Sequence, residues 1–358
     1  MGKRSAHRIL FRMLRLRSFA SFFVAFLSLF VSSFALAQAG PYKVLNTVKV
    51  GGDGGFDYVT ADSDARRLYV SRSGATGVTH VYNLDTLAEV GTVATGSAHG
   101  AVVDAASHHG FATSKPVTMF DAQTLAVIKT IDTGGNPDGF LADQDVHRVY
   151  ILSHSAPQVT VLNAADGSIA GHIALAGAPE QSVLDGKGHI FIDLEDKDAI
   201  AVADINTFAV TATYDVKSAG GGCAGLAIDR AHGVLFAACR DKKNMIIVNA
   251  ATGKIITTLP IGVGCDGAVF NPATSEVFST QGDGTLTVIK DNATSSNPSA
   301  SDFVVEQTVK TPLRARTITL DTKTGHLITM TGEFGAPVAP STRPTMIPGS
   351  FEIVVVGK

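Results

Sequence analysis

The feature that most constrains this chain is a sequence unit of about 42 residues that recurs seven times. Each copy has a small or apolar run that ends in Asp or Asn, then a short polar turn, then a second apolar run. The anchor residues that end the first run are Asp62, Asp104, Asp143, Asp185, Asp229, Asn271 and Asp321. Asp and Asn suit this place because their side chains accept hydrogen bonds from the backbone of the following turn.

A second pair of β-rich runs completes each unit, so the repeat contains four short strands and no helical periodicity. This pattern predicts an all-β fold, a single seven-bladed β-propeller. The seventh copy ends in one apolar run at residues 351–357 with no fourth run after it, whereas residues 42–50 form a run without a partner before the first copy. We therefore expect the N-terminal strand to close the last blade, which removes both unpaired sheet edges.

Residues 1–39 predict a signal peptide ahead of a propeller of residues 40–358. Six basic residues are followed by an apolar stretch at 19–36 and by small residues that allow cleavage after Ala37 or Ala39. An uncleaved membrane anchor is the alternative, because the apolar stretch reaches the lower limit for spanning a bilayer. We expect a periplasmic or secreted monomer that is not attached to a membrane after cleavage.

The charge of the remaining chain disfavours nucleic acid as a partner. The leader holds six of the 29 Lys and Arg residues and none of the 32 acidic residues, so the rest of the chain has a formal net charge of −9. A net-negative protein without basic tracts is a poor binder of a polyanion.

Three cysteines, Cys223, Cys239 and Cys265, permit one disulfide in an oxidising compartment. Cys223 and Cys265 occupy the same repeat position, six before the anchor, in neighbouring units, so we favour a Cys223–Cys265 disulfide. Cys239 is the competing partner, because a hairpin that turns about Ala231 sets it opposite Cys223. The spacing of the three thiols fits no zinc-ribbon pattern.

Five residues before the anchor, six of the seven copies carry an ionisable side chain. The residues at this offset, here called the ring residues, are Asp57, His99, Asp138, Glu180, Ala224, Asp266 and Arg316. Equivalent repeat positions lie at one height, so we expect the six ionisable ones to surround the mouth of the central channel and to bind a ligand. Clustered acids would raise one another's pKa, and Arg316 would lower that of its neighbour. A simple solvated rim is the alternative interpretation.

The ring residues are compatible with three kinds of function. His99 with Asp138, Glu180 or Asp57 could hold a hard or borderline divalent metal ion, which is the one candidate cofactor, and we favour His99, Asp138 and Glu180 as its ligands. A metal-dependent lactone hydrolase or lyase would use His99 or Glu180 as general base and Arg316 to stabilise an oxyanion. A protein-interaction scaffold would use the same face. We therefore expect a small molecule or a protein as partner at this upper face, whereas catalytic residues and substrate stay unassigned.

A proline-rich segment at residues 333–350 interrupts the seventh unit between its second and third strands. In a propeller, a loop at this place lies on the face where the innermost strand begins. We expect this segment to lie above the ring residues and to cover part of the channel mouth, since prolines stiffen a loop at low entropic cost.

Over residues 42–358 the chain resembles the YVTN-repeat β-propeller family, which includes YncE-like periplasmic proteins. The blade motif at 67–71 carries part of the resemblance. The more specific parts are Gly-Asp-Gly-Thr-Leu-Thr-Val at 282–288, Arg-Ala-Arg-Thr at 314–317 and Arg-Pro-Thr-Met-Ile-Pro-Gly-Ser-Phe at 343–351. The resemblance implies an exported seven-bladed propeller of unassigned activity. Cys223 and Cys265 depart from the family pattern, which has Pro or Val at those positions.

Overall fold

The computed structural model describes residues 40–337 and 344–358, and these residues form seven four-stranded antiparallel sheets. The innermost strands are β2 (Gly55–Asp62), β6 (Ala98–Asp104), β10 (Pro137–Asp143), β14 (Pro179–Leu184), β18 (Cys223–Asp229), β22 (Cys265–Asn271) and β26 (Ile318–Asp321). Each of them contacts the innermost strand of the next sheet, and β26 contacts β2 again. The sheets are therefore the blades of a closed seven-bladed β-propeller, as the repeat predicts.

The outer strands follow in the same order in every blade. The second strands are β3 (Arg67–Ser73), β7 (His109–Ser114), β11 (Arg148–Ser153), β15 (His189–Leu194), β19 (Val234–Cys239), β23 (Glu276–Gln281) and β27 (His326–Thr331). The third strands are β4 (Thr79–Asn83), β8 (Val117–Asp121), β12 (Gln158–Asn163), β16 (Ala199–Asp204), β20 (Asn244–Asn249), β24 (Thr285–Asp291) and β28 (Glu352–Gly357). The outermost strands are β5 (Glu89–Val93), β9 (Val127–Ile131), β13 (Ile169–Ala174), β17 (Val210–Asp215), β21 (Ile255–Pro260), β25 (Phe303–Lys310) and β1 (Lys43–Lys49).

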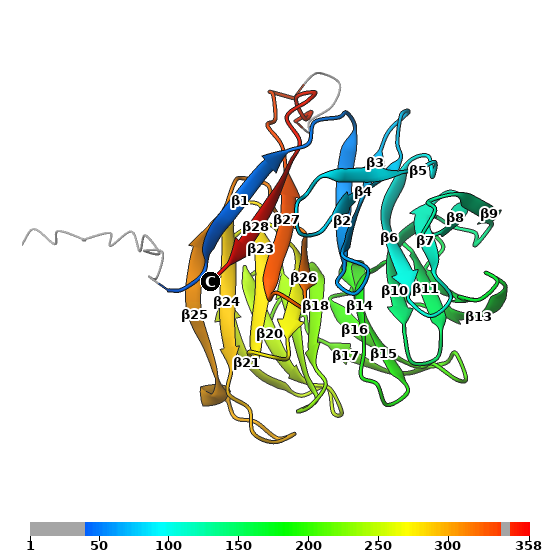
Figure 1. The fold of residues 1–358 in the computed structure, drawn as a ribbon. Helices are drawn as coiled ribbons and strands as arrows, with labels where there is room; N and C mark the ends of the chain where they lie inside the picture. The colour runs from blue at the N-terminus through cyan, green and yellow to red at the C-terminus, as the bar shows by residue number, and fades with distance from the viewer. Residues whose placement is uncertain (1–39, 338–343) are drawn as a thin grey trace, which may run out of the picture. The chain divides into compact units, whose positions relative to one another are not determined.

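The last blade closes as predicted, because the N-terminal strand β1 supplies its fourth strand. Figure 1 shows β1 beside β28, and the two pair antiparallel from Lys43 opposite Gly357 to Lys49 opposite Glu352. Two short 3₁₀ helices, η1 (Glu195–Lys197) and η2 (Ala300–Asp302), interrupt the loops of blades 4 and 6. Among the described residues no helix is long and apolar enough to cross a membrane.

The core lies between the blades rather than at the axis. The described residues form seven buried apolar clusters, one at each interface between adjacent blades. At the junction of blades 7 and 1, for example, Leu68 and Val70 of β3 pack with Ile328 and Met330 of β27. Alternate residues of each strand face opposite neighbours, so every blade is apolar on both faces. This packing leaves the loop ends of the innermost strands for polar side chains.

The expected signal peptide and its cleavage positions after Ala37 and Ala39 lie outside the described residues.

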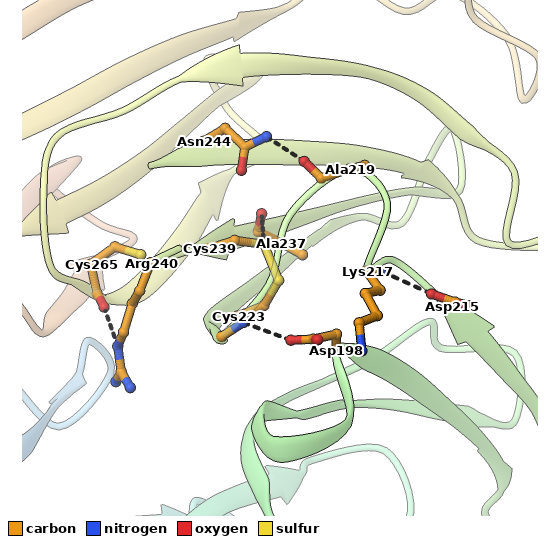
Figure 2. Close-up of a disulfide and its surroundings, with 11 residues drawn as sticks. Asp198, Asp215, Lys217, Ala219, Cys223, Ala237, Cys239, Arg240, Asn244 and Cys265 are labelled. Atoms are coloured by element: carbon orange, nitrogen blue, oxygen red, sulfur yellow. Dashed lines mark hydrogen bonds between the residues drawn. A yellow bond between two sulfur atoms is a disulfide. The ribbon is translucent and has the colours of Figure 1, made fainter. Parts of the chain in front are cut away.

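The disulfide prediction was wrong. Cys223 is bonded to Cys239, and Cys265 is a buried free thiol. Figure 2 shows Cys223 and Cys239 joined across β18 and β19, where they are direct cross-strand partners. They share the cluster between blades 4 and 5, whereas Cys265 belongs to the cluster between blades 5 and 6, so equal repeat positions on neighbouring blades do not bring the two sulfurs together.

Candidate functional site at the upper mouth

An irregularity in the innermost strands carries the ring residues. In each of blades 1 to 6 the register between the first and second strands shifts at the ring position, as it does between Pro137 and Phe140 around Asp138. A β-bulge re-aims a side chain that regular alternation would press against a neighbouring blade. The other bulges bracket Asp57, His99, Glu180, Ala224 and Asp266, and Arg316 lies just before β26.

The first group at the mouth joins three ring residues from blades 1, 2 and 3. His99 Nδ1 lies 2.9 Å from Asp57 Oδ2 and 3.1 Å from Asp138 Oδ1. The hydrogen bond to Asp57 raises the pKa of His99, against the opposing effect of burial. Burial raises the pKa of Asp138 to about 6 although His99 is near. Asp138 is 9% exposed, and its Oδ1 makes no hydrogen bond with the described residues.

The second group joins Glu180 to two residues of the loops between second and third strands. His154 Nε2 lies 3.8 Å from Glu180 Oε1 and 3.7 Å from Glu195 Oε2. Burial and the adjacent Glu195 carboxylate raise the pKa of Glu180. Burial opposes the charged form of Glu195 too, but hydrogen bonding from Glu180 and the charge of Arg240 outweigh it and hold the pKa of Glu195 below its ordinary value. The two neighbouring carboxyl groups therefore have pKa values shifted in opposite directions, with that of Glu180 raised and that of Glu195 lowered.

A tyrosine connects the first two groups. The Tyr58 hydroxyl donates a 3.2 Å hydrogen bond to Glu180 Oε2. Burial, followed by the nearby carboxylates of Glu180 and Asp138, raises the pKa of Tyr58 well above its ordinary value. Tyr58 is therefore a fixed hydrogen-bond donor between the two carboxylate groups.

The third group carries the positive charge of the mouth. Arg240 bonds both Glu195 and Asp266, and Arg316 Nε lies 3.0 Å from Asp266 Oδ2. Burial raises the pKa of Asp266, although Arg316 and Arg240 oppose this effect. Two guanidiniums thus meet one carboxylate at the junction of blades 5, 6 and 7.

The structure brings the six ionisable ring residues into this set of linked groups, but it divides the predicted metal ligands. His99 and Asp138 lie together with Asp57, whereas Glu180 lies with His154 and Glu195. Each of these two triads offers ligand atoms within 4.8 Å of one another. Five acidic side chains, two arginines and two histidines thus meet at the mouth, and the two arginines lie on the side of Asp266 and Glu195.

Sequence reasoning missed His154, Glu195 and Arg240, which a second repeat offset reveals. Each is the first residue after the second strand of its blade, as Lys115 is in blade 2. The glycines Gly74, Gly282 and Gly332 hold this place in blades 1, 6 and 7. The loops between second and third strands reach the same face as the start of the first strands, so both offsets contribute to one mouth.

The described part of the proline-rich segment lies on this upper face, as predicted. Gly349 donates a backbone hydrogen bond to Gly52 just before β2, and the Phe334 ring lies 6.5 Å from the Phe56 ring between centroids. Figure 1 shows the segment beside the connection that leads into β2. Residues 338–343, which include Pro340, lie outside the described residues.

Comparison with known proteins supports the fold and leaves the family open. Neither a family model nor a curated protein matches the chain. Similar solved structures include the RRP9 WD40 repeats, at 10% identity and a TM-score of 0.70 over 90% of this chain and 99% of that one. A chain of a mitotic checkpoint complex gives 14% identity and a TM-score of 0.65 over 90% and 95%. Kuenenia stuttgartiensis hydrazine synthase gives 15% and 0.64 over 84% and 97%. Likeness at this level of identity shows a propeller and nothing about activity.

Proposed function

We propose that this chain is an exported propeller whose upper mouth binds a divalent metal ion through Asp57, His99 and Asp138. The observation that carries the proposal is the meeting of one imidazole nitrogen with two carboxylates at 2.9 and 3.1 Å. His99 Nδ1 makes its hydrogen bond to Asp57, so the buried Asp138 Oδ1 lies at ion-pair distance but receives no hydrogen bond from the described residues. A buried carboxylate oxygen without a donor is costly in the metal-free protein. A bound cation would remove that cost, and the remaining coordination positions would accept a small ligand.

The ligand set indicates the class of ion. One imidazole and two carboxylates suit a borderline or hard divalent ion such as Zn²⁺ or Mn²⁺ better than a soft ion. The ion must displace the proton that His99 holds, and the raised pKa of His99 makes this competition stronger. Affinity should therefore fall as pH decreases.

Export follows from the basic, apolar and small-residue pattern of residues 1–39. The Cys223–Cys239 disulfide supports the same proposal, because such bonds persist in oxidising compartments and are rare in the cytosol. We place the mature protein in the periplasm or outside the cell, as a YncE-like member of the YVTN-repeat propellers. A small molecule or a protein at the upper face is its proposed partner.

A second candidate function, acid–base catalysis, is favoured by one observation, the opposite pKa shifts of Glu180 and Glu195. Adjacent carboxyl groups with separated pKa values supply one acid and one base. Glu180 would donate a proton and Glu195 would accept one, which moves the base role away from Glu180. A lactone hydrolase or lyase is the corresponding reaction class, with Arg240 or Arg316 positioned to stabilise an oxyanion.

Metal binding to the purified, chelator-treated protein tests the first proposal. Titration calorimetry with Zn²⁺ and Mn²⁺ should show saturable binding of one ion per chain at the triad and a raised melting temperature. His99→Ala and Asp138→Asn should lose that binding, while Asp145→Asn, at an exposed turn on the opposite face, should retain it. Absence of saturable binding, or equal binding by His99→Ala, would overturn the metal site.

Glu180→Gln separates the candidate functions. The metal proposal expects this variant to bind the ion at the Asp57 triad with unchanged stoichiometry. The catalytic candidate expects it to lose turnover of a panel of simple lactones that the parent protein hydrolyses. If the protein neither binds a metal nor hydrolyses any lactone, the remaining hypothesis is a protein-interaction scaffold. Pull-down with upper-face variants is then the next measurement.

A further inference from the structure

A recess beside the ring has a character different from that of the acidic mouth. It has a volume of about 1030 Å³ and lies where blades 6, 7 and 1 meet the proline-rich segment. Three stretches form most of its wall, and they contain Phe56 before the bulge of β2, Arg314 and Arg316 before β26, and Phe334 and Met346 of the proline-rich segment. The size is at the upper end of the range for small-molecule pockets.

The glycine pattern explains why the recess exists. Blades 2 to 5 have Lys, His, Glu and Arg as the first residue after the second strand, whereas blades 6, 7 and 1 have Gly282, Gly332 and Gly74. Gly282 lines the recess directly. A Cβ at Gly332 would lie 2.7 Å from the sulfur of Met346, so the glycine lets this wall residue pack. The ionisable side chains that fill one side of the upper face are absent here.

Two guanidiniums, those of Arg314 and Arg316, stand in the wall. Arg316 pairs with Asp266, which also bonds Arg240, and Arg240 bonds Glu195 in turn. Arg314 forms no ion pair with the described residues, and its guanidinium lies 4.5 Å above the centroid of the Phe334 ring. Its backbone has a φ of +65°, which is unfavourable for a residue with a Cβ, and its N–H donates to Gly282 O at 2.9 Å.

The acidic residue of the recess is already satisfied by its own chain. Asp283 Oδ2 accepts from Val263 N at 2.6 Å, and Asp283 Oδ1 accepts from Thr285 Oγ1 at 2.6 Å. This carboxylate holds its own loop and forms no ion pair with Arg314 among the described residues. The lining therefore contains two guanidiniums and one carboxylate, a formal net charge of one positive unit.

The rest of the wall is apolar and partly open to solvent. Phe56 and Phe334 face each other with centroids 6.5 Å apart at an interplanar angle of 58°. At the rim, Leu313 is 68% exposed and Val263 is 48% exposed. Large apolar side chains exposed next to a guanidinium such as that of Arg314, which has no ion pair among the described residues, are typical of a binding surface.

We infer that this recess binds an organic anion with an apolar or aromatic body. The acid group would bond Arg314 and Arg316, since guanidinium forks match carboxylate and phosphate oxygens. The body would lie against Phe56, Phe334 and Met346. The inference goes beyond the proposed metal site, because it uses none of the three proposed ligands. Arg314 and Arg316 lie in one of the stretches that carry the family resemblance, and Pro344 to Met346 lie in another.

Binding of 2-naphthoate, compared with its neutral amide 2-naphthamide and with inorganic phosphate, tests the inference on the chelator-treated protein. Titration calorimetry should give saturable 1:1 binding of 2-naphthoate and at least about tenfold weaker binding of the amide, because a charge-assisted bond is lost. Inorganic phosphate, which has no apolar body, should bind more weakly than 2-naphthoate. Equal affinity for acid and amide would mean apolar adhesion only, and would overturn the inference, as would phosphate binding more tightly than 2-naphthoate.

Variants assign the binding to this recess. Arg314→Gln should weaken 2-naphthoate binding about tenfold or more, Arg314→Lys should restore part of it, and Phe334→Ala should weaken the acid and the amide alike. Lys129→Gln removes a positive charge from the exposed outer strand β9 and should change nothing. Retained affinity in Arg314→Gln would refute the site. His99→Ala should bind 2-naphthoate normally, so failure of the metal proposal and failure of this one give different results.

Discussion

Both ends of the innermost strands carry carboxyl groups, but the pKa values of these groups are shifted in opposite directions at the two ends. At the turn end, hydrogen bonds outweigh burial and hold the pKa of Asp104, Asp185 and Asp321 below the ordinary value. At the mouth end, burial raises the pKa of Asp138 and Glu180. The turn carboxylates accept bonds from their own turns, and Asp104 and Asp321 each accept one more group from a neighbouring blade, His147 and Arg66. The mouth carboxylates Asp138 and Glu180 lie instead beside other carboxylates. The turn carboxylates therefore stabilise the fold in their charged form. At the mouth the charged form of Asp138 and Glu180 costs stability because of burial, which is typical of binding sites.

The largest effect should come from a turn anchor. Asp321 is 1% exposed and accepts 2.7 and 2.8 Å hydrogen bonds from Arg66, which joins blade 7 to blade 1. Asp321→Ala removes these bonds and the bonds to its own turn, so we expect the free energy of unfolding at pH 7 to fall by about 2–4 kcal/mol. Urea unfolding measures this loss. A change under about 0.5 kcal/mol, the usual size for an exposed pair, would contradict the structural role of the turn end.

The next effect concerns the mouth end of blade 5, where Cys223–Cys239 ties β18 to β19. The bond closes a loop with a sequence separation of 16, and reduction should lower the free energy of unfolding by about 2–3 kcal/mol. Urea unfolding with and without a reductant measures it. Cys265→Ala should keep the full effect of the reductant, and Cys223→Ala should abolish it. Loss of the reductant effect in Cys265→Ala would instead indicate a Cys223–Cys265 disulfide, the pairing that the repeat positions favour.

Asp138→Asn should have a smaller effect of the opposite sign. A carboxyl group with a folded pKa of about 6 binds protons more tightly in the folded chain than in the unfolded chain. Stability of the metal-free protein should therefore fall as pH rises from about 4 to 6 and then level off. His99, whose pKa is also raised, contributes stability below its unfolded pKa that is lost as pH rises through its folded pKa. We expect Asp138→Asn to be more stable than the parent at pH 8 by roughly 1–3 kcal/mol.

Melting temperatures from pH 4 to 8 test this sign. The parent should lose stability over that range, and Asp138→Asn should show a flatter profile. A variant that is less stable than the parent at pH 8 would mean that Asp138 is an ordinary structural carboxylate, like those of the turns.

The sequence predicted the fold and the ring residues of the mouth, because both follow from the repeat. Repeats impose equivalent heights, so the offset that contains Asp138 could be read without knowing any contact. The disulfide could not, because it depends on which residues are direct cross-strand partners, and Cys223 faces Cys239 while Cys265 faces Gln281. Glu195 was missed because a shorter turn in blade 4 places it ten residues after its anchor, where His154 is eleven after its own. The recess could not be predicted either, because it exists where Gly282 and Gly332 replace the ionisable residues of other blades. That substitution has a meaning only once the structure shows that these positions lie on one face.

The smallest effect should come from the rim of the upper face, where Lys49 Nζ lies 3.1 Å from Glu333 Oε1 and both side chains are 63% exposed. Water and salt screen such a pair, so Glu333→Gln should change the free energy of unfolding by less than about 0.5 kcal/mol. Phe334 is the more important contact, because it packs on Phe56 and beneath Arg314. Limited proteolysis of the proline-rich segment should therefore be faster in Phe334→Ala and unchanged in Glu333→Gln, in low and in high salt. Faster cleavage of Glu333→Gln at low salt alone would show that charge, rather than aromatic packing, holds the described part of the segment on the upper face. The apolar wall of the recess would then lose its main support.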